Sequence, residues 1–275
     1  MINYALFGNP VKHSKSPRIH ELFAEQMKIH NHNYGIYSPS LNKFPQTLHT
    51  FFAKGAKGAN ITTPFKQKAF LLSDKLTKRA LLAGSVNTFK KIENNLLLGD
   101  NTDGIGLLTD LQRIRIINST DKILIIGSGG AAHGIIEPLL SYGCSIIITN
   151  RNICRAEKLV HRFRNYGSIS AVDVKILEKH KFDLILNATS CGIEGKIPLL
   201  PNKIINRYTR CYDLFYDSKI TPFLEWCKKL GAEQYADGIG MLVGQAAYSF
   251  FLWHGLLPNI TPVIELIKYE MRKNI

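Results

Sequence analysis

The sequence is poor in cysteine and has no cysteine pattern of the kind that builds disulfide frameworks or zinc sites. The number of cysteines is odd, and no two of them form a C-x-x-C pair; they are Cys144, Cys154, Cys191, Cys211 and Cys227. Disulfide frameworks and zinc sites both use cysteines paired at short spacings. We therefore expect free thiols, a reducing compartment, no zinc site and a cytoplasmic location.

Acidic residues are also scarce. The chain has 21 Asp and Glu against 35 Lys and Arg, a formal net charge of +14. A positive charge of this size attracts phosphate polymers. However, the basic residues are scattered singly from Lys12 to Lys273, without a basic run that contains interleaved aromatic residues. We therefore predict no nucleic-acid partner, and we interpret the charge as a compositional drift of the whole chain.

Long apolar runs are nearly absent. Only residues 239–257 lack Asp, Glu, Lys and Arg over a length close to the roughly 18 residues of a membrane span. This stretch contains Gln245, His254 and three glycines, and it lacks the flanking charge asymmetry of an anchor. We predict a buried helix of a soluble protein, in which Gln245 needs a hydrogen-bond partner. The first eight residues have no basic n-region, so a first strand is expected there and not a signal peptide.

The sequence does contain alternating strand and helix patterns, which predict an α/β fold. Apolar runs predict strands at 2–7, 34–37 and 59–61, between helices expected over 16–30, 41–52 and 65–72. Ser16 before Pro17 is expected to cap the first helix. A hairpin is expected over 86–98 with Asn94 and Asn95 at its turn, and a helix over 104–115. After a polar break at 118–121 the pattern restarts, which in 275 residues predicts two domains.

The restart carries a glycine-rich motif. Residues 123–126 form a continuous apolar run, typical of a strand buried in a parallel sheet, and GSGGAA follows at 127–132. Gly127 permits a tight turn, Gly129 lets the backbone approach a pyrophosphate, and Ala132 lets a helix pack closely on the sheet. A helix pattern to about residue 142 and a strand at 145–149 complete the expected context. We interpret the motif as a dinucleotide site, with an ordinary structural turn as the alternative.

The end of the next strand indicates which dinucleotide is bound. Folds that prefer NAD place Asp or Glu about 20 residues beyond the first glycines. Here Asn150 and Arg151 stand at that point, and Arg155 follows one helical turn later. A carboxylate would repel a 2'-phosphate, whereas a guanidinium binds it with charge-assisted hydrogen bonds. We therefore predict NADP; if the arginines are only solvated surface charges, the choice of cofactor stays open.

Several segments together resemble the shikimate dehydrogenase family. They are SKSP at 14–17, NITTPFK at 60–66, GSVNT at 84–88 and GDNTDG at 99–104, followed by NATS at 187–190, YDLFY at 212–216 and ADGIGMLVGQA at 236–246. The resemblance covers nearly the whole chain. It implies an α/β fold of two domains, with a substrate-binding catalytic domain at 1–103 and 239–275 and a Rossmann-type NADP-binding domain at 104–238.

The activity that the resemblance implies is the reversible, NADPH-dependent reduction of 3-dehydroshikimate to shikimate. This reaction belongs to the biosynthesis of chorismate and the aromatic amino acids. The enzyme would be a monomer or a homodimer whose partners are its small-molecule substrate and NADP, without a membrane or a nucleic acid.

The resemblance also implies which residues form the site. Lys66 would exchange the proton at the reacting oxygen, and Asp103 would orient Lys66 and bind the substrate. The other substrate-binding positions would be Ser14, Ser16, Thr62, Asn87, Tyr216 and Gln245. The cofactor-binding positions would be Gly127, Ser128, Gly129, Gly130, Ala131, Asn150, Arg151, Arg155, Leu214 and Gly238. Each residue alone has an ordinary structural interpretation, such as a helix cap for Asp103. Their joint occurrence in the order of the family favours the enzyme.

Elementary chemistry agrees with these assignments. Hydride transfer between a carbinol carbon and a nicotinamide ring must be matched by proton transfer at oxygen, and no metal is needed for it. Two alternatives are kept. An NAD-dependent quinate/shikimate dehydrogenase would be favoured by an acidic residue at position 151. A catalytically idle NADPH-binding regulator would be favoured by the loss of Lys66 or Asp103, and both residues are present.

Overall fold

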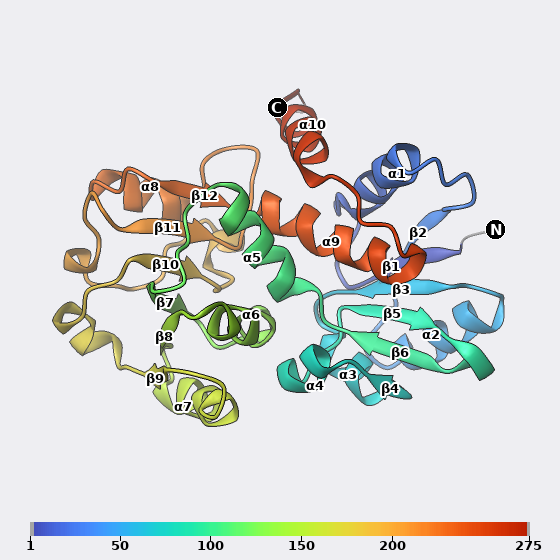
Figure 1. Ribbon diagram of the computed structural model, residues 1–275, viewed down its shortest axis with the longest axis horizontal. Helices are drawn as coiled ribbons and strands as arrows, with labels where there is room; N and C mark the ends of the chain where they lie inside the picture. Colours follow the sequence, from blue (N-terminus) through green and yellow to red (C-terminus); the bar gives the residue numbers. More distant parts are fainter. Residues whose placement is uncertain (1–2, 274–275) are drawn as a thin grey trace. The chain divides into compact units, whose positions relative to one another are not determined.

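The computed structural model of the chain describes residues 3–273, which fold into two compact units. Unit 1 is formed by Met1–Gly106 and Leu242–Ile267, and unit 2 by Leu107–Met241 and Lys268–Ile275, each as far as its residues are described. Each unit has a six-stranded sheet of its own with helices packed against it (Figure 1). The predicted α/β class is confirmed.

The sheet of unit 1 is mixed, with the order β2-β1-β3-β5-β6-β4. Its strands are β1 (Tyr4–Phe7), β2 (Tyr34–Tyr37), β3 (Gly58–Ile61), β4 (Lys75–Leu76), β5 (Thr88–Lys91) and β6 (Leu97–Asp100). Strand β1 runs parallel to β2 and β3, whereas β5 is antiparallel to both β3 and β6. The carboxyl ends of β1, β3 and β6 and the amino end of β5 therefore meet at one edge of the sheet.

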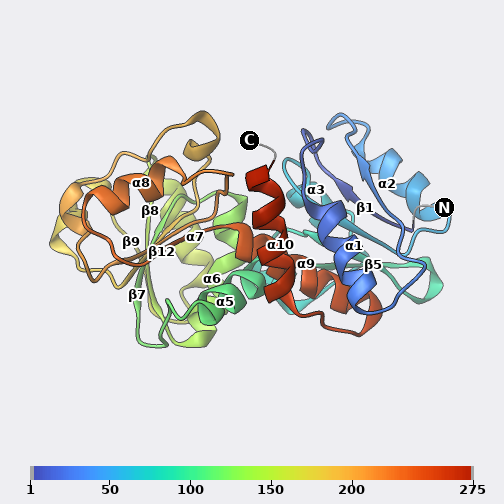
Figure 2. The same cartoon turned by 90° about the horizontal axis from the view of Figure 1, so that it is seen from above.

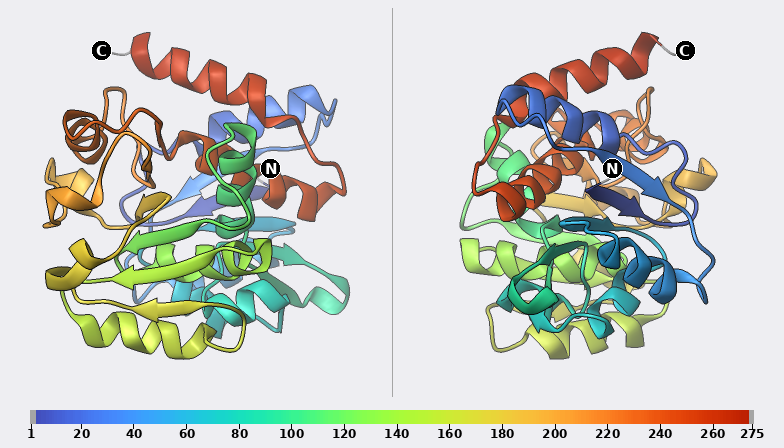
Figure 3. Two further views of the ribbon diagram at one scale, coloured as in Figure 1. Left: turned by 60° about the vertical axis from the view of Figure 1, so that its left-hand side comes forward. Right: turned by 90° about the vertical axis from the view of Figure 1, so that its right-hand side faces the viewer.

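Helices cover both faces of this sheet. They are α1 (Ser16–Gln26), α2 (Phe44–Ala53), α3 (Lys66–Leu71), α4 (Lys78–Ala83) and most of α9 (Ile239–His254). Figure 1 and the right-hand view of Figure 3 place α2 and α3 on one face and α1 on the other. The face towards α2 is rich in phenylalanine, because Phe7 and Phe89 of the strands pack with Phe44 and Phe51 of the helix. Burial of such large apolar surfaces is the main favourable contribution to folding.

The sheet of unit 2 is entirely parallel, with the order β12-β11-β10-β7-β8-β9. Its strands are β7 (Lys122–Ile126), β8 (Ser145–Thr149), β9 (Ile169–Ala171), β10 (Leu184–Asn187), β11 (Arg210–Asp213) and β12 (Tyr235–Asp237). The left-hand view of Figure 3 shows β7, β8 and β9 side by side. The strand order reverses between β7 and β10, which is the point where parallel sheets of this type bind ligands beyond the carboxyl ends of their strands.

The helices that follow in the chain are α5 (Asp103–Arg113), α6 (Gly130–Tyr142), α7 (Ile153–Phe163), α8 (Pro222–Lys229) and α10 (Ile260–Lys273). Short 3-10 helices occur at η1 (Glu93–Asn95), η2 (Val174–Lys179), η3 (Cys191–Glu194) and η4 (Asn202–Ile204). In unit 2, Leu124 and Ile126 of β7 share a core cluster with Phe223 of α8. Figure 2 shows α8 on one side of these strands and α6 on the other. Strand β7 is buried on both faces, as its continuous apolar run predicts.

Most of the predicted elements are confirmed. The strands at 34–37 and 145–149 have the predicted bounds, and the hairpin of β5 and β6 turns at Asn94 and Asn95, whose φ angles are 57° and 59°. The apolar stretch after residue 239 forms α9, which ends at His254 before Gly255 with φ of 73°. Within residues 3–273, no helix has both the length and the apolar character needed to cross a membrane.

Several details of the prediction are wrong. The N-cap of α1 is Lys15, so Ser16 is already helical and caps nothing. This helix ends at Gln26 instead of near residue 30, and Lys28 then adopts a φ of 54°. Helix α2 begins at Phe44, later than expected. Strand β4 and helix α4 were not predicted, although Thr77 and Gly84 are the cap residues of α4. Thr before a helix and Gly after it are typical boundary signals.

Candidate active site

Seven of the predicted site residues lie in unit 1, and the topology of its sheet explains why they are neighbours. Thr62 directly follows β3, Asn87 directly precedes β5, and Asp103 follows β6. Lys66 begins α3 after the β3 loop, Ser14 lies between β1 and α1, and Ser16 begins α1. These positions belong to the edge at which the carboxyl ends of β1, β3 and β6 meet the amino end of β5.

The centre of this edge is an ion pair between Lys66 and Asp103. Lys66 Nζ donates to Asp103 Oδ2 at 2.5 Å, and the two side chains are 20% and 7% exposed. Removing one partner of a largely buried pair leaves an uncompensated charge and is strongly unfavourable. The ammonium nevertheless keeps some access to solvent. The pair therefore offers a proton-carrying group whose position is fixed by a carboxylate.

Asn87 binds the second oxygen of the Asp103 carboxylate. Its Nδ2 donates to Asp103 Oδ1 and to Thr102 Oγ1, each at 2.9 Å, and its Oδ1 accepts from the backbone N–H of Thr102 at 2.9 Å. Asn87 is 2% exposed. Both oxygens of Asp103 are thus engaged, one by a cation and one by a neutral amide.

Gln245 of α9 contacts the Asn87 amide. Asn87 Nδ2 donates to Gln245 Oε1 at 3.3 Å, and Gln245 Nε2 donates to the Leu242 carbonyl at 2.8 Å. The expected partner of Gln245 is therefore found. A close approach of α5 makes this possible, because a Cβ at Gly106 would overlap the backbone nitrogen of Gln245. A side chain at position 106 would push the two helices apart.

Ser14, Ser16 and Thr62 line the part of this edge formed by β1 and β3. Ser14 Oγ donates to Ser16 Oγ at 3.2 Å and also accepts from the backbone N–H of Ser16 at 3.2 Å. Thr62 N donates to the Phe7 carbonyl at 2.8 Å, and a Cβ at Gly8 would overlap the Thr62 methyl group. Uncharged hydroxyls are therefore placed where β1 and β3 end. Such groups can both donate to and accept from a polyol or a carboxylate.

In unit 2 the glycine-rich loop follows β7 at the point where the strand order reverses. Gly127 has a φ of 101°, which favours glycine, and its N–H donates to the Thr149 carbonyl at 2.8 Å. A Cβ at Gly129 or Gly130 would meet no atom within 4 Å. Ser128 and Ala131 complete the loop and the first turn of α6. The loop therefore leaves open space at a helix amino end, where the helix dipole and free N–H groups favour an anion.

Buried polar atoms beside this loop support the same interpretation. Ser128 Oγ and Thr149 Oγ1 are buried and have no hydrogen-bond partner within the described residues. Helix α6 has Gly129 at its N-cap and therefore no capping side chain. Buried polar groups are normally satisfied, so unpaired ones call for a ligand or solvent. The open space and the unpaired groups fit a dinucleotide pyrophosphate.

The predicted ribose-binding residues follow β8. Arg151 and Arg155 are both exposed, and no acidic residue stands between positions 150 and 155. Asn150 Nδ2 donates to the Asn152 carbonyl at 3.1 Å, and the Asn152 side chain caps α7 by accepting from the Cys154 N–H at 3.1 Å. The asparagines thus shape the turn that carries the two guanidinium groups.

Strands β10 and β11 end in a polar brace that sequence reasoning did not single out. Asp213 and Asn187 are 0% exposed, and Asn187 Nδ2 donates to Asp213 Oδ1 at 3.0 Å. Asp213 also accepts from Thr221 Oγ1 at 2.7 Å and from the Phe215 N–H at 3.2 Å. Burial raises the pKa of Asp213 to about 6. The signal was present, since both residues lie in the NATS and YDLFY segments.

This brace positions the remaining predicted residues of unit 2. Leu214 and Tyr216 follow Asp213 directly, and Gly238 is needed after β12 because a Cβ there would overlap the Leu214 carbonyl. Burial raises the pKa of the Tyr216 phenol. Tyr216 and the seven predicted site residues of unit 1 belong to different units. Its contribution to the substrate site therefore stays a prediction.

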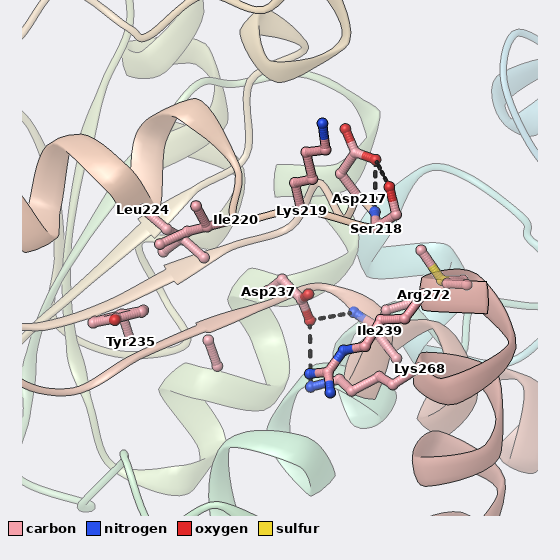
Figure 4. Close-up of a pocket in the computed structure, with 12 residues that line it drawn as sticks. Asp217, Ser218, Lys219, Ile220, Leu224, Tyr235, Asp237, Ile239, Lys268 and Arg272 are labelled. Atoms are coloured by element: carbon pink, nitrogen blue, oxygen red, sulfur yellow. Dashed lines mark hydrogen bonds and ion pairs between the residues drawn. The ribbon is translucent and has the colours of Figure 1, made fainter. Parts of the chain in front are cut away.

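A hollow of about 360 Å³ lies elsewhere in unit 2, between the loop after Tyr216, β12 and the last turns of α10 (Figure 4). Asp237 lies at its centre, where its Oδ1 accepts from the Ile239 N–H at 3.3 Å and lies 3.7 Å from Lys268 Nζ. Among the described residues that line it, none belongs to the predicted site. Asp237 is engaged by Ile239 and Lys268, and the hollow contains none of the predicted catalytic residues, so it does not replace the site at the sheet edge.

Three family models match consecutive parts of the chain. The shikimate dehydrogenase substrate binding domain matches residues 6–89, the shikimate / quinate 5-dehydrogenase model matches 111–209, and the shikimate 5'-dehydrogenase C-terminal domain matches 238–268. The matches follow the order of the predicted segments.

Solved structures are similar over nearly the whole chain. Shikimate 5-dehydrogenase from Thermus thermophilus, in complex with NADP(H) and shikimate, is 30% identical, with 98% of this chain and 99% of that chain covered and a TM-score of 0.88. An Ael1 enzyme from Pseudomonas putida is 36% identical, with 97% and 98% covered and a TM-score of 0.90. Shikimate 5-dehydrogenase from Listeria monocytogenes, in complex with shikimate and NAD, is 26% identical, with 97% and 96% covered and a TM-score of 0.86.

Proposed function

We propose, on the premise that this chain belongs to the shikimate dehydrogenase family of oxidoreductases, that it reduces 3-dehydroshikimate to shikimate with NADPH and catalyses the reverse reaction. One observation carries the proposal. The ion pair of Lys66 and Asp103, at 2.5 Å, stands among neutral donors and acceptors at one edge of the unit 1 sheet. A small polyol acid requires such a lining, and a ketone reduction requires such a proton carrier.

Lys66 is the proton carrier in this mechanism. NADPH, when bound, supplies the hydride that forms the new C–H bond. The Lys66 ammonium gives one proton to the ketone oxygen, so that the product leaves as an alcohol, and the neutral amine regains a proton from solvent through its exposed part. In the reverse reaction the amine accepts the hydroxyl proton. Asp103 holds Lys66 in place by a charge-assisted hydrogen bond.

Neutral side chains bind the rest of the substrate. Ser14 and Ser16 bind the carboxylate, and the family resemblance assigns Tyr216 to the substrate as well. Thr62 and Gln245 join Asn87 and Asp103 around the ring hydroxyls. Hydroxyl and amide groups suit this task because each can serve as donor or acceptor according to the orientation of the substrate hydroxyl.

Unit 2 binds the dinucleotide. The loop 127–131 would hold the pyrophosphate, because it leaves open space beside the unpaired hydroxyls of Ser128 and Thr149. Leu214 and Gly238 would also contact the dinucleotide, and Asn150 would support the turn that carries the arginines. Arg151 and Arg155 bind the 2'-phosphate, which makes NADP the preferred cofactor. The Thermus thermophilus enzyme was crystallised with NADP(H) and the Listeria monocytogenes enzyme with NAD.

The biological setting is proposed from the same reaction. The enzyme would act in the cytoplasm, in the biosynthesis of chorismate and the aromatic amino acids, as a monomer or a homodimer. It would have no nucleic-acid partner. Domain roles follow the predicted division, with substrate binding at 1–103 and 239–275 and NADP binding at 104–238.

One assay tests the function. The absorbance of the reduced cofactor, NADPH or NADH, is followed during oxidation of shikimate and of quinate, with NADP and with NAD in turn. We expect the highest kcat/KM for shikimate with NADP. Faster oxidation of quinate with NAD would favour the quinate/shikimate dehydrogenase. Absence of turnover in all four combinations, with NADPH fluorescence still showing binding, would favour the idle regulator and reject the enzyme.

A further inference from the structure

A chain of buried polar groups continues behind Asn87, away from Lys66. Tyr34 OH donates to Asn60 Oδ1 at 2.8 Å, which fixes the amide of Asn60. Asn60 Nδ2 then donates to Thr88 Oγ1 at 3.1 Å and to Ser249 Oγ at 2.9 Å. Thr88 and Ser249 are 0% exposed.

The hydrogen bonds that lead from Tyr34 through Asn60, Thr88 and Asn87 to Asp103 each have a defined donor. Because Asn60 donates to Thr88 Oγ1, the Thr88 proton is free for Asn87 Oδ1, which it meets at 2.9 Å. Asn87 then donates to Asp103, which accepts from Lys66. The donors therefore run in one direction, from Tyr34 to the carboxylate.

Ser249 joins this chain to α9. Its Oγ lies 2.7 Å from Thr88 Oγ1, 3.2 Å from Thr102 Oγ1 and 3.1 Å from the Gln245 carbonyl oxygen, so its single proton has three acceptors within reach. Ser249 follows Gln245 by one helical turn, so the same helix presents both residues to this part of unit 1. The Thr88 and Thr102 hydroxyls thus contact the Asn87 amide directly, and Ser249 contacts both of these hydroxyls.

The orientation of this amide matters for the reaction. In the observed orientation the amino group faces a carboxylate, and the carbonyl faces a backbone N–H and the Thr88 hydroxyl. A reversed amide would place its oxygen against the Asp103 carboxylate and its amino group against the Thr102 N–H. Both contacts would be repulsive, and Asp103 would lose its second support.

We propose that Thr88 and Ser249 are positioning residues for the reaction, because the Thr88 hydroxyl holds the Asn87 amide that in turn holds Asp103 and Lys66, and Ser249 holds the hydroxyls of Thr88 and Thr102, which both contact that amide. This inference rests on the proposed function for its rate effect. Neither side chain needs to contact the substrate. Errors in the position of catalytic groups on the order of 1 Å can cost about a hundredfold in rate, so the loss of one support should be measurable.

The test uses Thr88→Val and Ser249→Ala in the full chain, with shikimate and NADP as substrates. We expect kcat to fall about tenfold in each variant, with the KM for NADP within about twofold of the parent. Thr88→Ser, which keeps the hydroxyl, should recover at least about half of the parent kcat. Values of kcat within about twofold of the parent in both variants would overturn the proposal.

A double-mutant cycle asks whether the effect passes through Asn87. Residues that act through a shared partner are not additive. In an Asn87→Ala background, Thr88→Val should therefore lower kcat by less than about twofold. A loss as large as in the parent would reject the pathway through Asn87. Ile19→Val is the matched control for stability, since Ile19 is 0% exposed in unit 1 and takes no part in this chain.

An experiment that does not depend on enzymatic turnover tests this inference separately from the proposed function. The side-chain amide protons of Asn87 can be followed by NMR in the 15N-labelled chain. We expect their exchange with solvent to rise at least about tenfold in Thr88→Val and to be unchanged in Ile19→Val. If the parent does not oxidise shikimate, the proposed function fails, while the exchange rates still decide whether Thr88 holds the amide. Unchanged exchange would overturn the inference.

Discussion

Acidification should destabilise unit 1 through a buried histidine cluster. His20 is 0% exposed and stacks on Tyr34 with 4.4 Å between ring centroids. His32 is 8% exposed, stacks on Tyr4 at 4.3 Å, and its Nδ1 lies 2.9 Å from Nε2 of His254. These contacts bury the rings among aromatic side chains, where a charged imidazolium is poorly solvated.

The pKa values follow from this environment. Burial, and next the neighbouring His254, lower the pKa of His32 to about 3. Burial, and next the neighbouring His32, hold the pKa of His20 well below 6.5. The pKa of His254 is also lowered, by burial and then by Lys57 and Lys90. Tyr4, Tyr34 and Trp253 face the rings from the adjacent elements and supply no negative charge near neutral pH.

The sign and size of the effect follow from proton binding. Below pH 6.5 an unfolded histidine binds a proton that His20 and His32 do not bind in the fold. Their contribution to stability is therefore complete above pH 6.5 and is lost progressively as the pH falls towards the folded pKa values. One pH unit below 6.5, each such histidine lowers the free energy of unfolding by about 1.4 kcal/mol. The two together should lower it by about 3 kcal/mol between pH 7.5 and 5.5.

Urea unfolding at pH 7.5, 6.5 and 5.5 measures this effect. The chain has two tryptophans, and Trp253 lies in the cluster, whereas Trp226 lies in unit 2. Fluorescence of a Trp226→Phe variant therefore reports the unfolding of unit 1. His32→Phe in this background should remove about half of the pH dependence, and the exposed His49→Gln should remove none. A change below about 0.5 kcal/mol over this pH range would refute the reasoning.

Three further predictions concern the site and the charge. In steady-state kinetics, Lys66→Ala should lower kcat by about 10² to 10⁴, with a smaller change in the KM for shikimate. Lys66→Arg should not restore kcat, because a guanidinium does not release its proton. A change confined to KM would make Lys66 a binding residue. Arg151→Ala should weaken NADP binding about 10- to 100-fold in a fluorescence titration and barely affect NAD; equal losses would assign Arg151 to the fold. Binding to random duplex DNA should be weak, with Kd roughly 10⁻⁴ to 10⁻⁶ M at physiological salt, and a salt-resistant submicromolar complex would contradict the drift interpretation.

The sequence was sufficient where local patterns decide the structure. The continuous apolar run at 123–126 predicts a strand buried on both faces, and β7 occupies the middle of the parallel sheet of unit 2. Asn94 and Asn95 predict a turn with positive φ, and both residues adopt it. These features depend on neighbours a few residues apart, so the sequence alone contains the relevant information.

The sequence was insufficient where a contact joins distant segments. Thr88 and Ser249 meet across 161 positions, and Asn87 and Gln245 across 158. Gln245 was singled out because a long polar side chain in an apolar helix needs a partner. Ser249 was not, because a helical serine can bond the carbonyl one turn earlier and gives no further signal. Its contacts to Thr88 and Thr102 exist only once β5, β6 and α9 pack together.

The neutral character of these supporting groups follows from the electrostatics of the ion pair. A second charge beside Asp103 would compete with Lys66 for the carboxylate or repel it, and either effect would change how readily Lys66 exchanges its proton. Amide and hydroxyl groups satisfy the remaining oxygen without adding charge, which a largely buried pair requires. Asn87 and Thr88 therefore fix the geometry of Asp103 and leave its negative charge for Lys66. Replacing Asn87 by Asp should accordingly lower kcat more than replacing it by Ala, because a second carboxylate disturbs the charge balance as well as the position.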